Sequence, residues 1–263
     1  MNPTPDLSII IPTFRREAML LDAVHSALAV PGLQVEVWVL DDSPEGSARS
    51  VIEGLGDPRV TYLLHQPPTG GHPAVLRNRG AQLARAPLLY FLDDDDRALP
   101  EALARACAQL SASAAGVLIS APQPFGDDAQ RVEEERAYFE QAVAWLAQGP
   151  SALRVVARLL FGPALLVCST CVIRRDAFVA TGGFSTTMPV YEDIDFYMRA
   201  VRQAGYVAMA EPVVARRVGG PSLISACTRP QMLAAYAESQ GQYRRQRGWW
   251  EFMALKLWQR LGR

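Results

Sequence analysis

The sequence has almost no net charge and no long apolar segment, and its first residues do not show the pattern of a signal peptide. Its 263 residues include 26 Lys or Arg and 27 Asp or Glu, so the formal net charge is −1. Because proteins that bind nucleic-acid phosphates usually carry a basic excess, we expect no nucleic-acid partner. The longest apolar region, 159–173, is interrupted by Gly162 and Pro163 and is too short to cross a bilayer. The N-terminal apolar run lacks the basic segment of a signal peptide, which predicts a cytoplasmic protein.

Cysteine is also scarce, with four residues in the whole sequence. Cys168 and Cys171 form one C-x-x-C pair, but the second pair that a structural zinc site usually requires is missing. A zinc site and a redox pair stay open as alternatives. We expect these cysteines to be buried as small apolar residues in a strand.

Two common phosphate-binding loops are absent as well. The only lysine is Lys256, near the end of the sequence, so the G-x-x-x-x-G-K of a Walker loop cannot be present. The turn after the first expected strand reads PTFRRE, which lacks the glycines of a dinucleotide-binding fold. The other common route to a diphosphate is a divalent cation held by carboxylates.

Short apolar runs alternate with helix-like periodic segments through the first hundred residues. This alternation predicts an α/β fold, with a mostly parallel central sheet and helices on both faces. The expected strands are 7–12, 35–42, 59–65 and 86–92, and the expected helices are 17–29, 47–55 and 74–84.

Acidic residues follow two of these strands. Asp41 and Asp42 end the second strand, and the run Asp93 to Asp96 follows the fourth. In parallel sheets, ligands bind beyond the carboxyl ends of the strands, so both groups lie where a ligand is expected. Four adjacent carboxylates repel one another unless a cation or a proton offsets the charge. Hard cations such as Mn²⁺ and Mg²⁺ prefer oxygen ligands, and the sequence therefore indicates a metal at this edge.

The second half begins with an acidic helical segment, 126–149, in which Glu133 to Glu135 are expected to face solvent. Sheet-like sequence returns at 165–175. A loop with Gly182 and Gly183 then leads to Glu192 and Asp193, which begin a helix. This acidic pair has two open interpretations, a catalytic role and stabilisation of the helix start by negative charge.

Taken in order, the segments SIIIPTFRR, VWVLDDSPEGS, AVLRNRGAQLARAPLLYFLDDDD, VIRRDAFVATGGF and YEDIDFYMRAVRQAG resemble the inverting glycosyltransferases of family 2. The resemblance runs from about Leu7 to Val218 and implies the Rossmann-like GT-A fold. It implies a glycosyltransferase domain over 1–228, with a nucleotide-binding half over about 1–110 and an acceptor-binding half over about 111–228. It also implies a nucleoside-diphosphate sugar as donor, for which the family favours uridine diphosphate as the carrier.

The resemblance implies a nucleotide-binding set formed by Pro12, Thr13, Arg15, Asp41, Asp42, Arg77, Asn78, Asp93 and Asp94. Within this set, Asp41 would accept a hydrogen bond from the base, whereas Asp42 has an alternative role in supporting its loop. Asp93 corresponds to the ribose-side aspartate of the family's Asp-x-Asp motif. Asp95 corresponds to the metal-contacting one and, with Asp93, would hold Mn²⁺ or Mg²⁺. Asp96 is open to a structural or a functional role.

The resemblance assigns catalysis to Asp193, as the general base that deprotonates an acceptor hydroxyl of a glycan, a lipid-linked molecule or another compound. Glu192 is the neighbour that could exchange roles with it. Many relatives carry a histidine after the last sheet region, but this sequence reads VARRVGGPSLIS there. Arg216 or Arg217 would then bind the leaving diphosphate, or the aspartates would act alone.

The last segment, 229–263, lies beyond the resemblance and reads as a basic, aromatic-rich helical tail. It holds seven Arg or Lys, two Glu, and the aromatic residues Trp249, Trp250, Phe252 and Trp258. Peripheral contact with an anionic membrane at its inner face is one interpretation. Packing on the catalytic domain or pairing of two subunits is the other, and the one that we favour slightly.

Two other functions remain to be weighed against glycosyl transfer. A sugar nucleotidyltransferase would carry a glycine-rich N-terminal signature and an active-site lysine, and neither is present. A catalytically silent binding module would have no need for Asp93, Asp95 and Asp193 together. A metal-dependent inverting glycosyltransferase of bacterial glycan or glycoconjugate synthesis is therefore the leading prediction.

Overall fold

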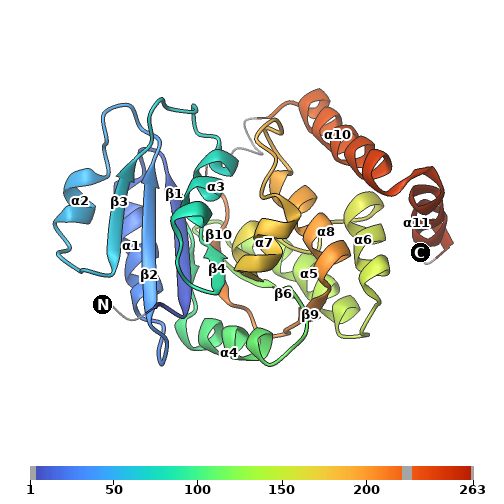
Figure 1. The fold of residues 1–263 in the computed structure, drawn as a ribbon, viewed down its shortest axis with the longest axis horizontal. Coiled ribbons are helices and arrows are strands. Elements are labelled where there is room, and N and C mark those ends of the chain that lie inside the picture. Colours follow the sequence, from blue (N-terminus) through green and yellow to red (C-terminus); the bar gives the residue numbers. More distant parts are fainter. Residues whose placement is uncertain (1–3, 221–226, 262–263) are drawn as a thin grey trace.

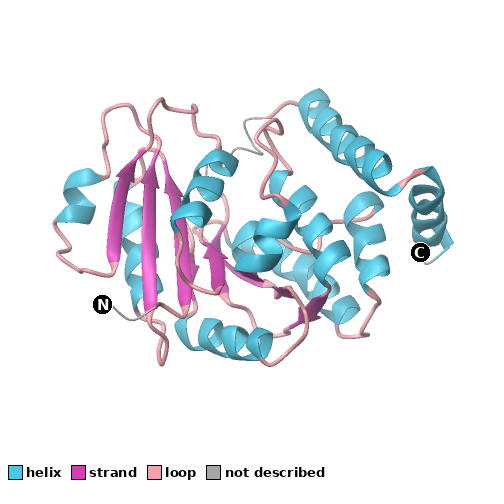
Figure 2. Cartoon of the chain, viewed as in Figure 1, coloured by secondary structure: helices cyan, strands magenta, loops and turns pink. Residues whose placement is uncertain are grey.

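The computed structural model describes residues 4–220 and 227–261, which form a central sheet covered by helices on both faces (Figures 1 and 2). The strand order is β3-β2-β1-β4-β8-β6-β9. The first four of these strands are parallel to one another, and β8 is antiparallel to both of its neighbours. The predicted α/β fold with a mostly parallel sheet is confirmed.

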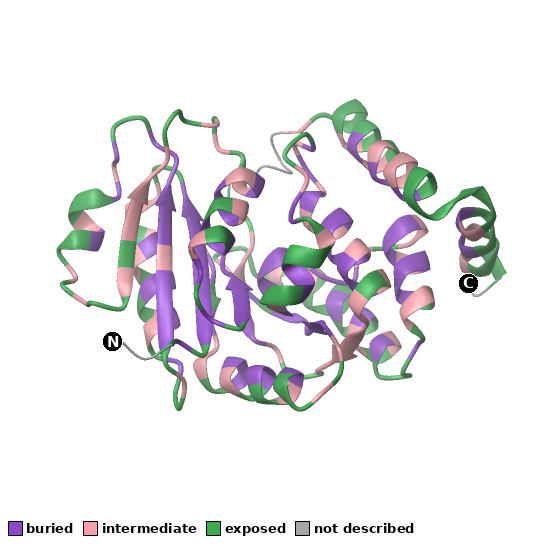
Figure 3. Cartoon of the chain, in the orientation of Figure 1, coloured by how far each residue is buried: buried purple, intermediate pink, exposed green. Residues whose placement is uncertain are grey.

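The expected elements of the first half are present with small changes at their ends. The strands are β1 (Leu7–Thr13), β2 (Val35–Asp41), β3 (Val60–Leu64) and β4 (Leu88–Phe91). The helices are α1 (Glu17–Leu28), α2 (Arg49–Glu53) and α3 (Pro73–Leu83). Strand β1 is buried along its whole length, because alternate side chains enter separate apolar clusters on the two faces of the sheet (Figure 3).

The second half completes the central sheet and adds helices around it. Its strands in this sheet are β6 (Val117–Ile119), β8 (Cys171–Arg174) and β9 (Tyr206–Ala208). Its helices are α4 (Pro100–Ser111), α5 (Ala129–Leu146), α6 (Ala152–Phe161), α7 (Arg175–Thr181) and α8 (Glu192–Ala204). Helix α8 begins at Glu192, as the sequence predicts.

A small second sheet was not predicted. It has the order β5-β10-β7 and consists of β5 (Arg97–Ala98), β10 (Val214–Arg217) and β7 (Pro122–Phe125). Because β5 follows the aspartate run directly, the pairing of β5 with β10 fixes the position of that run.

The C-x-x-C pair is buried, as expected, but only part of it is strand. Cys168 lies in the short 3₁₀ helix η1 (Cys168–Thr170), and β8 starts at Cys171. The strand expected over 165–175 is therefore shorter at its N-terminal end. The turn points the backbone of Ser169 toward the sheet, where its carbonyl accepts a hydrogen bond from the Tyr90 hydroxyl.

The tail forms two helices, α10 (Arg229–Arg247) and α11 (Trp249–Leu261), separated at Gly248. Both pack against the body of the protein. Ser239 of α10 donates a hydrogen bond to the fully buried Asp195 of α8 at 2.8 Å, and Glu251 of α11 pairs with Arg202 of α8 at 2.9 Å. Over residues 4–220 and 227–261, no helix is both long and apolar enough to cross a bilayer.

Gly80 lets α3 approach the sheet closely, and its replacement should destabilise the protein. A Cβ atom at this position would lie 2.5 Å from Cγ2 of Ile10, which is buried in β1. We expect Gly80→Ala to lower the free energy of unfolding by about 1 kcal/mol or more, because overpacking costs about 1–3 kcal/mol and the helix preference of alanine returns less than that.

Gly241 of α10 provides the matched control. A Cβ atom there meets only the end of the Arg245 side chain, at 3.3 Å. Gly241→Ala should therefore raise stability by up to about 1 kcal/mol. Urea denaturation of both variants measures the difference, and a Gly80→Ala protein as stable as the wild type would show that the contact is not tight.

Candidate active site

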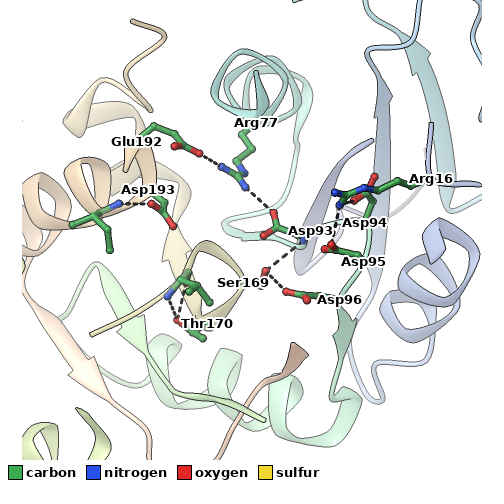
Figure 4. A network of polar contacts seen from close by, with 12 residues as sticks. Arg16, Arg77, Asp93, Asp94, Asp95, Asp96, Ser169, Thr170, Glu192 and Asp193 are labelled. Carbon is green, nitrogen blue, oxygen red and sulfur yellow. Dashed lines mark hydrogen bonds and ion pairs between the residues drawn. The ribbon is translucent and has the colours of Figure 1, made fainter. Parts of the chain in front are cut away.

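The aspartates that follow β4 have different partners. Thr13 donates a hydrogen bond to Asp94 at 2.8 Å. The Arg16 guanidinium contacts Asp94 at 3.0 Å and Asp95 at 2.8 Å (Figure 4). Arg16 lies directly before α1, in the turn after β1. The carboxyl ends of β1 and β4 therefore meet through one shared cation.

Arg77 connects the aspartate run to α8. Its guanidinium contacts Asp93 at 2.6 Å and Glu192 at 2.8 Å, and the residue is only 4% exposed (Figure 4). A guanidinium removed from water is strongly destabilising unless carboxylates compensate for the lost hydration. Arg77 on α3 therefore holds Asp93 and Glu192, which lie 99 residues apart in the sequence, in one network.

Asp96 has a structural position. It is 3% exposed, and it accepts hydrogen bonds at 2.9 Å from the Ser169 hydroxyl and from the backbone N–H of Arg217. Burial, together with the charges of Asp93 and Asp95, raises the pKa of Asp96 well above its usual range. This side chain joins the aspartate run to η1 and β10.

The electrostatics of the run favour a counter-ion. Burial raises the pKa of Asp94 to about 6, although Arg16 acts in the opposite direction. Burial and the neighbouring charge of Asp93 raise the pKa of Asp95. The oxygen donors of Asp93 and Asp95 fit a hard divalent cation, and both side chains remain partly accessible, at 34% and 24%. Within the described ranges no three His, Cys, Asp or Glu side chains converge as a ready metal site, so such an ion would need further oxygen ligands from a bound molecule.

Asp41 and Asp42 are both fully buried, and they bind different loops. The carboxylate of Asp41 accepts hydrogen bonds from two backbone amides of the loop after β2 and from the Tyr62 hydroxyl. Asp42 accepts hydrogen bonds from Thr69 and from the backbone of Gly71. The expected contact of Asp41 with a base stays a prediction, and it would require this fully buried carboxylate to become accessible.

The remaining residues of the expected nucleotide set lie around the same edge. Pro12 and Thr13 are buried at the end of β1. Arg15 is exposed, has a positive φ of 56°, and pairs with Glu45 at 2.8 Å. A nucleotide-binding role for these three positions stays a prediction, since Thr13 and Arg15 contact side chains of the protein itself.

Asn78 braces the loop before α8. Its side chain donates to the carbonyl of Phe184 and accepts from the N–H of the same residue, both at 2.8 Å. The neighbouring Gly183 has a φ of 74°, and a Cβ atom there would lie 2.6 Å from Oδ1 of Asn78. This position therefore requires glycine for both its conformation and its close contact.

Asp193 differs from Glu192 in its exposure and in its hydrogen-bond partners. Glu192 is 7% exposed and engaged by Arg77, whereas Asp193 is partly exposed and accepts a hydrogen bond only from the N–H of Ile194 among the described residues. Burial and the charge of Glu192 raise the pKa of Asp193 to about 7. A carboxyl group that ionises near neutral pH can accept a proton at that pH.

Arg216 and Arg217 both reach the site region. Arg216 pairs with Glu135 of α5, so the expectation that Glu133 to Glu135 all face solvent is wrong for Glu135, whose charge β10 neutralises. The Arg217 side chain donates to the carbonyl of Asp95 at 3.3 Å. Residues 221–226, which complete the segment without the family's histidine, lie outside the described residues.

Sequence reasoning missed Arg16 and Ser169. Arg16 is the second arginine of the turn PTFRRE, and the resemblance drew attention only to Arg15. Arg16 could have been distinguished from Arg15 by its position immediately before the expected helix. Ser169 lies between the two cysteines, and the interpretation of the C-x-x-C pattern considered only the cysteines.

Comparison of the sequence with known proteins identifies a family. The sequence model of glycosyl transferase family 2 matches residues 8–181. The chain is 37% identical over 101 residues to the GalNAc(5)-diNAcBac-PP-undecaprenol beta-1,3-glucosyltransferase of Campylobacter jejuni, covering 38% of this chain and 32% of that protein. It is 30% identical over 124 residues to the succinoglycan biosynthesis protein ExoO of Rhizobium meliloti, covering 45% and 35%. The chain thus spans about a third of the length of these two relatives.

Solved structures agree on the fold. S. aureus TarS 1-349 in complex with UDP-GlcNAc has a TM-score of 0.66 and 19% identity, over 89% of this chain and 66% of that one. The mannosyltransferase PcManGT of Pyrobaculum calidifontis, in complex with GDP-Man and Mn²⁺, has a TM-score of 0.60 and 14% identity, over 99% and 81%. The chain therefore has the GT-A fold and belongs to glycosyl transferase family 2.

Proposed function

We propose that this protein is a metal-dependent inverting glycosyltransferase that moves a sugar from a nucleoside-diphosphate sugar to an acceptor hydroxyl, with Asp193 as its general base. One observation carries the proposal. Arg77 engages Glu192 and Asp93 at once, which leaves Asp193 as the partly exposed carboxylate beside the aspartate run. Glycosyl transfer itself follows from the family.

The donor half of the proposal rests on the edge formed by β1, β2 and β4. Asp93 and Asp95 would hold Mn²⁺ or Mg²⁺, and the ion would offset the charge of the departing diphosphate. The structural neighbours bound to UDP-GlcNAc and to GDP-Man with Mn²⁺ support this class of ligand. Pro12, Thr13, Arg15, Asp41, Asp42, Arg77, Asn78 and Asp94 would then shape the nucleotide site.

Arg16 would compete with the metal ion for Asp95. In this structure its guanidinium supplies the positive charge that Asp94 and Asp95 need. An ion bound to Asp95 would share that carboxylate with Arg16 or displace its guanidinium. Binding of donor and metal is therefore expected to rearrange the turn after β1.

The acceptor half rests on α8. Asp193 would remove the proton of the acceptor hydroxyl while the acceptor oxygen forms a bond to C1 of the sugar. The bond between C1 and the diphosphate oxygen breaks on the opposite face, so the configuration at C1 inverts and no bond to the protein forms. Asp193 keeps the proton until water removes it.

The acceptor class is proposed from the relatives. The Campylobacter jejuni protein is named for a lipid-linked acceptor, and the Rhizobium meliloti protein for synthesis of a polysaccharide. We infer a hydroxyl group of a bacterial glycan or lipid-linked glycoconjugate as the acceptor. A site on the cytoplasmic side of the membrane would fit such a substrate.

Asp193→Asn should lower turnover by at least ~10²-fold, because the amide keeps the shape of the side chain but cannot accept the proton. The KM for the donor should change little, since Asp193 acts in the transition state. The matched control is Glu192→Gln, which retains the hydrogen-bond acceptor for Arg77. Steady-state kinetics with a Mn²⁺-loaded nucleotide sugar compare the two variants. If Glu192→Gln abolished transfer and Asp193→Asn retained it, the two roles would have to be exchanged.

Asp95→Ala should weaken binding of a nucleoside diphosphate with Mn²⁺ by at least the ~10-fold known for groups that only support a metal ligand. The fold should be unaffected, because Asp95 is partly accessible and its partner Arg16 keeps a second carboxylate in Asp94. Asp127→Ala, which removes an exposed carboxylate before α5, is the control. Calorimetric titration of uridine diphosphate with and without Mn²⁺ measures the change, and equal affinities for Asp95→Ala and wild type would remove Asp95 from the metal site.

A further inference from the structure

A pocket of about 320 Å³ lies between α6 and α11, outside the network around Arg77. Its lining includes two arginines of α6, Arg154 and Arg158, and two tryptophans, Trp145 of α5 and Trp258 of α11. The Arg158 guanidinium stacks on the Trp145 ring, 4.6 Å from its centre. Cationic and aromatic groups thus face the same space.

Arg158 lacks a counter-ion among the described residues. Its Nε atom is inaccessible to water and has no hydrogen-bond partner there, and no carboxylate in that part of the chain lies within ion-pair distance of Arg158 or Arg154. Burial lowers the pKa of Arg158, because no carboxylate in the described ranges compensates for the lost hydration. By contrast, Arg77 and the partly buried Arg199 each pair with carboxylates, although the Nε of Arg77 also has no hydrogen-bond partner among the described residues. An unpaired buried N–H of a guanidinium calls for an anionic oxygen as its acceptor.

Helix α11 presents a second apolar face beside this pocket. Phe252 and Leu255 face the protein core. The opposite side carries an exposed apolar stripe at helical spacing, formed by Trp250, Met253, Leu257 and Leu261. Trp250 is 81% exposed and Leu261 is 75% exposed, and Trp258 lies between this stripe and the pocket. Figure 3 shows the outer surface of α11 as exposed, at the end of the molecule farthest from β3.

Positive charge lies next to the stripe. Lys256 and Arg260 lie on α11, and Arg244, Arg245 and Arg247 end α10 just before it. Within residues 4–220 and 227–261, none of these five side chains is in an ion pair. An apolar stripe edged by tryptophan and flanked by cations is complementary to an anionic bilayer surface, whose interface accepts tryptophan rings and whose phosphates attract cations.

We propose that α11 and the pocket beneath it form a docking site for an anionic phospholipid bilayer, in which a lipid phosphate binds Arg154 and Arg158 while Trp250 and Leu257 enter the interface. The cations bring the surface to the bilayer, and the apolar stripe then contributes burial of its side chains. This site is separate from the proposed catalytic residues, so it stands or falls independently of the reaction.

Sedimentation of the full chain with phosphatidylglycerol vesicles tests the site, with phosphatidylcholine vesicles as the neutral reference. The protein should sediment with the first and remain in solution with the second. Arg154→Gln with Arg158→Gln should reduce partitioning by about 25-fold, since each cation near an anionic surface contributes roughly fivefold. The control Arg79→Gln with Arg175→Gln removes two exposed charges elsewhere and should have less than a twofold effect.

The apolar contribution has its own pair of variants. Trp250→Ala with Leu257→Ala should abolish sedimentation, whereas Val179→Ser, at a position 65% exposed on α7, should not.

Circular dichroism verifies that each variant is folded. Arg154→Gln alone, at an exposed position, provides a milder variant if the double arginine variant unfolds. Wild-type protein that stays in solution with phosphatidylglycerol, or charge and apolar variants that sediment like wild type, would overturn the proposal. Thermal stabilisation by inorganic phosphate without vesicle binding would instead identify a site for free phosphate and would likewise overturn membrane docking.

Discussion

The arrangement of the site depends on one buried guanidinium, that of Arg77. It connects α3, the aspartate run after β4 and the start of α8 through ion pairs of 2.6 and 2.8 Å. Because a buried arginine without carboxylates is strongly unfavourable, Asp93 and Glu192 are held close to it. As a result, the two adjacent acids differ: Glu192 is bound by Arg77, whereas Asp193 stays partly exposed.

The same half of the protein is supported from behind by the tail. Asp195, two residues after Asp193, is fully buried and binds Arg199 of its own helix and Ser239 of α10. Arg202, further along α8, pairs with Glu251 of α11. The tail therefore steadies the helix that begins with Asp193, while the outer face of α11 stays exposed. Both interpretations of the tail that the sequence left open are thus compatible, since packing uses one face and the proposed docking uses the other.

The sequence predicted the elements whose signal is local. Strands β1, β2 and β4 are buried on both faces of the sheet and read as nearly continuous apolar runs, so they and the acids at their ends could be located. The small second sheet was missed because β5 spans only Arg97–Ala98 and carries no apolar pattern.

Candidate site residues were found by their motifs, but the residues that they contact were not. The pairing of Arg16 with Asp94 and Asp95 joins residues far apart in sequence, and the hydrogen bonds that occupy Asp41 depend on a loop geometry that spacing does not specify.

The central claim is that Asp193 is a base whose pKa lies near 7 because of burial and the charge of Glu192. An acid with a raised pKa is protonated, and inactive as a base, below that pKa and ionised above it. The dependence of kcat/KM on pH reports this ionisation in the free enzyme. We expect kcat/KM to rise about tenfold per pH unit in the acid range, to level off above a pH of about 7, and to lose this limb in Asp193→Asn. A flat wild-type profile, or a limb that persists unchanged in Asp193→Asn, would contradict the account.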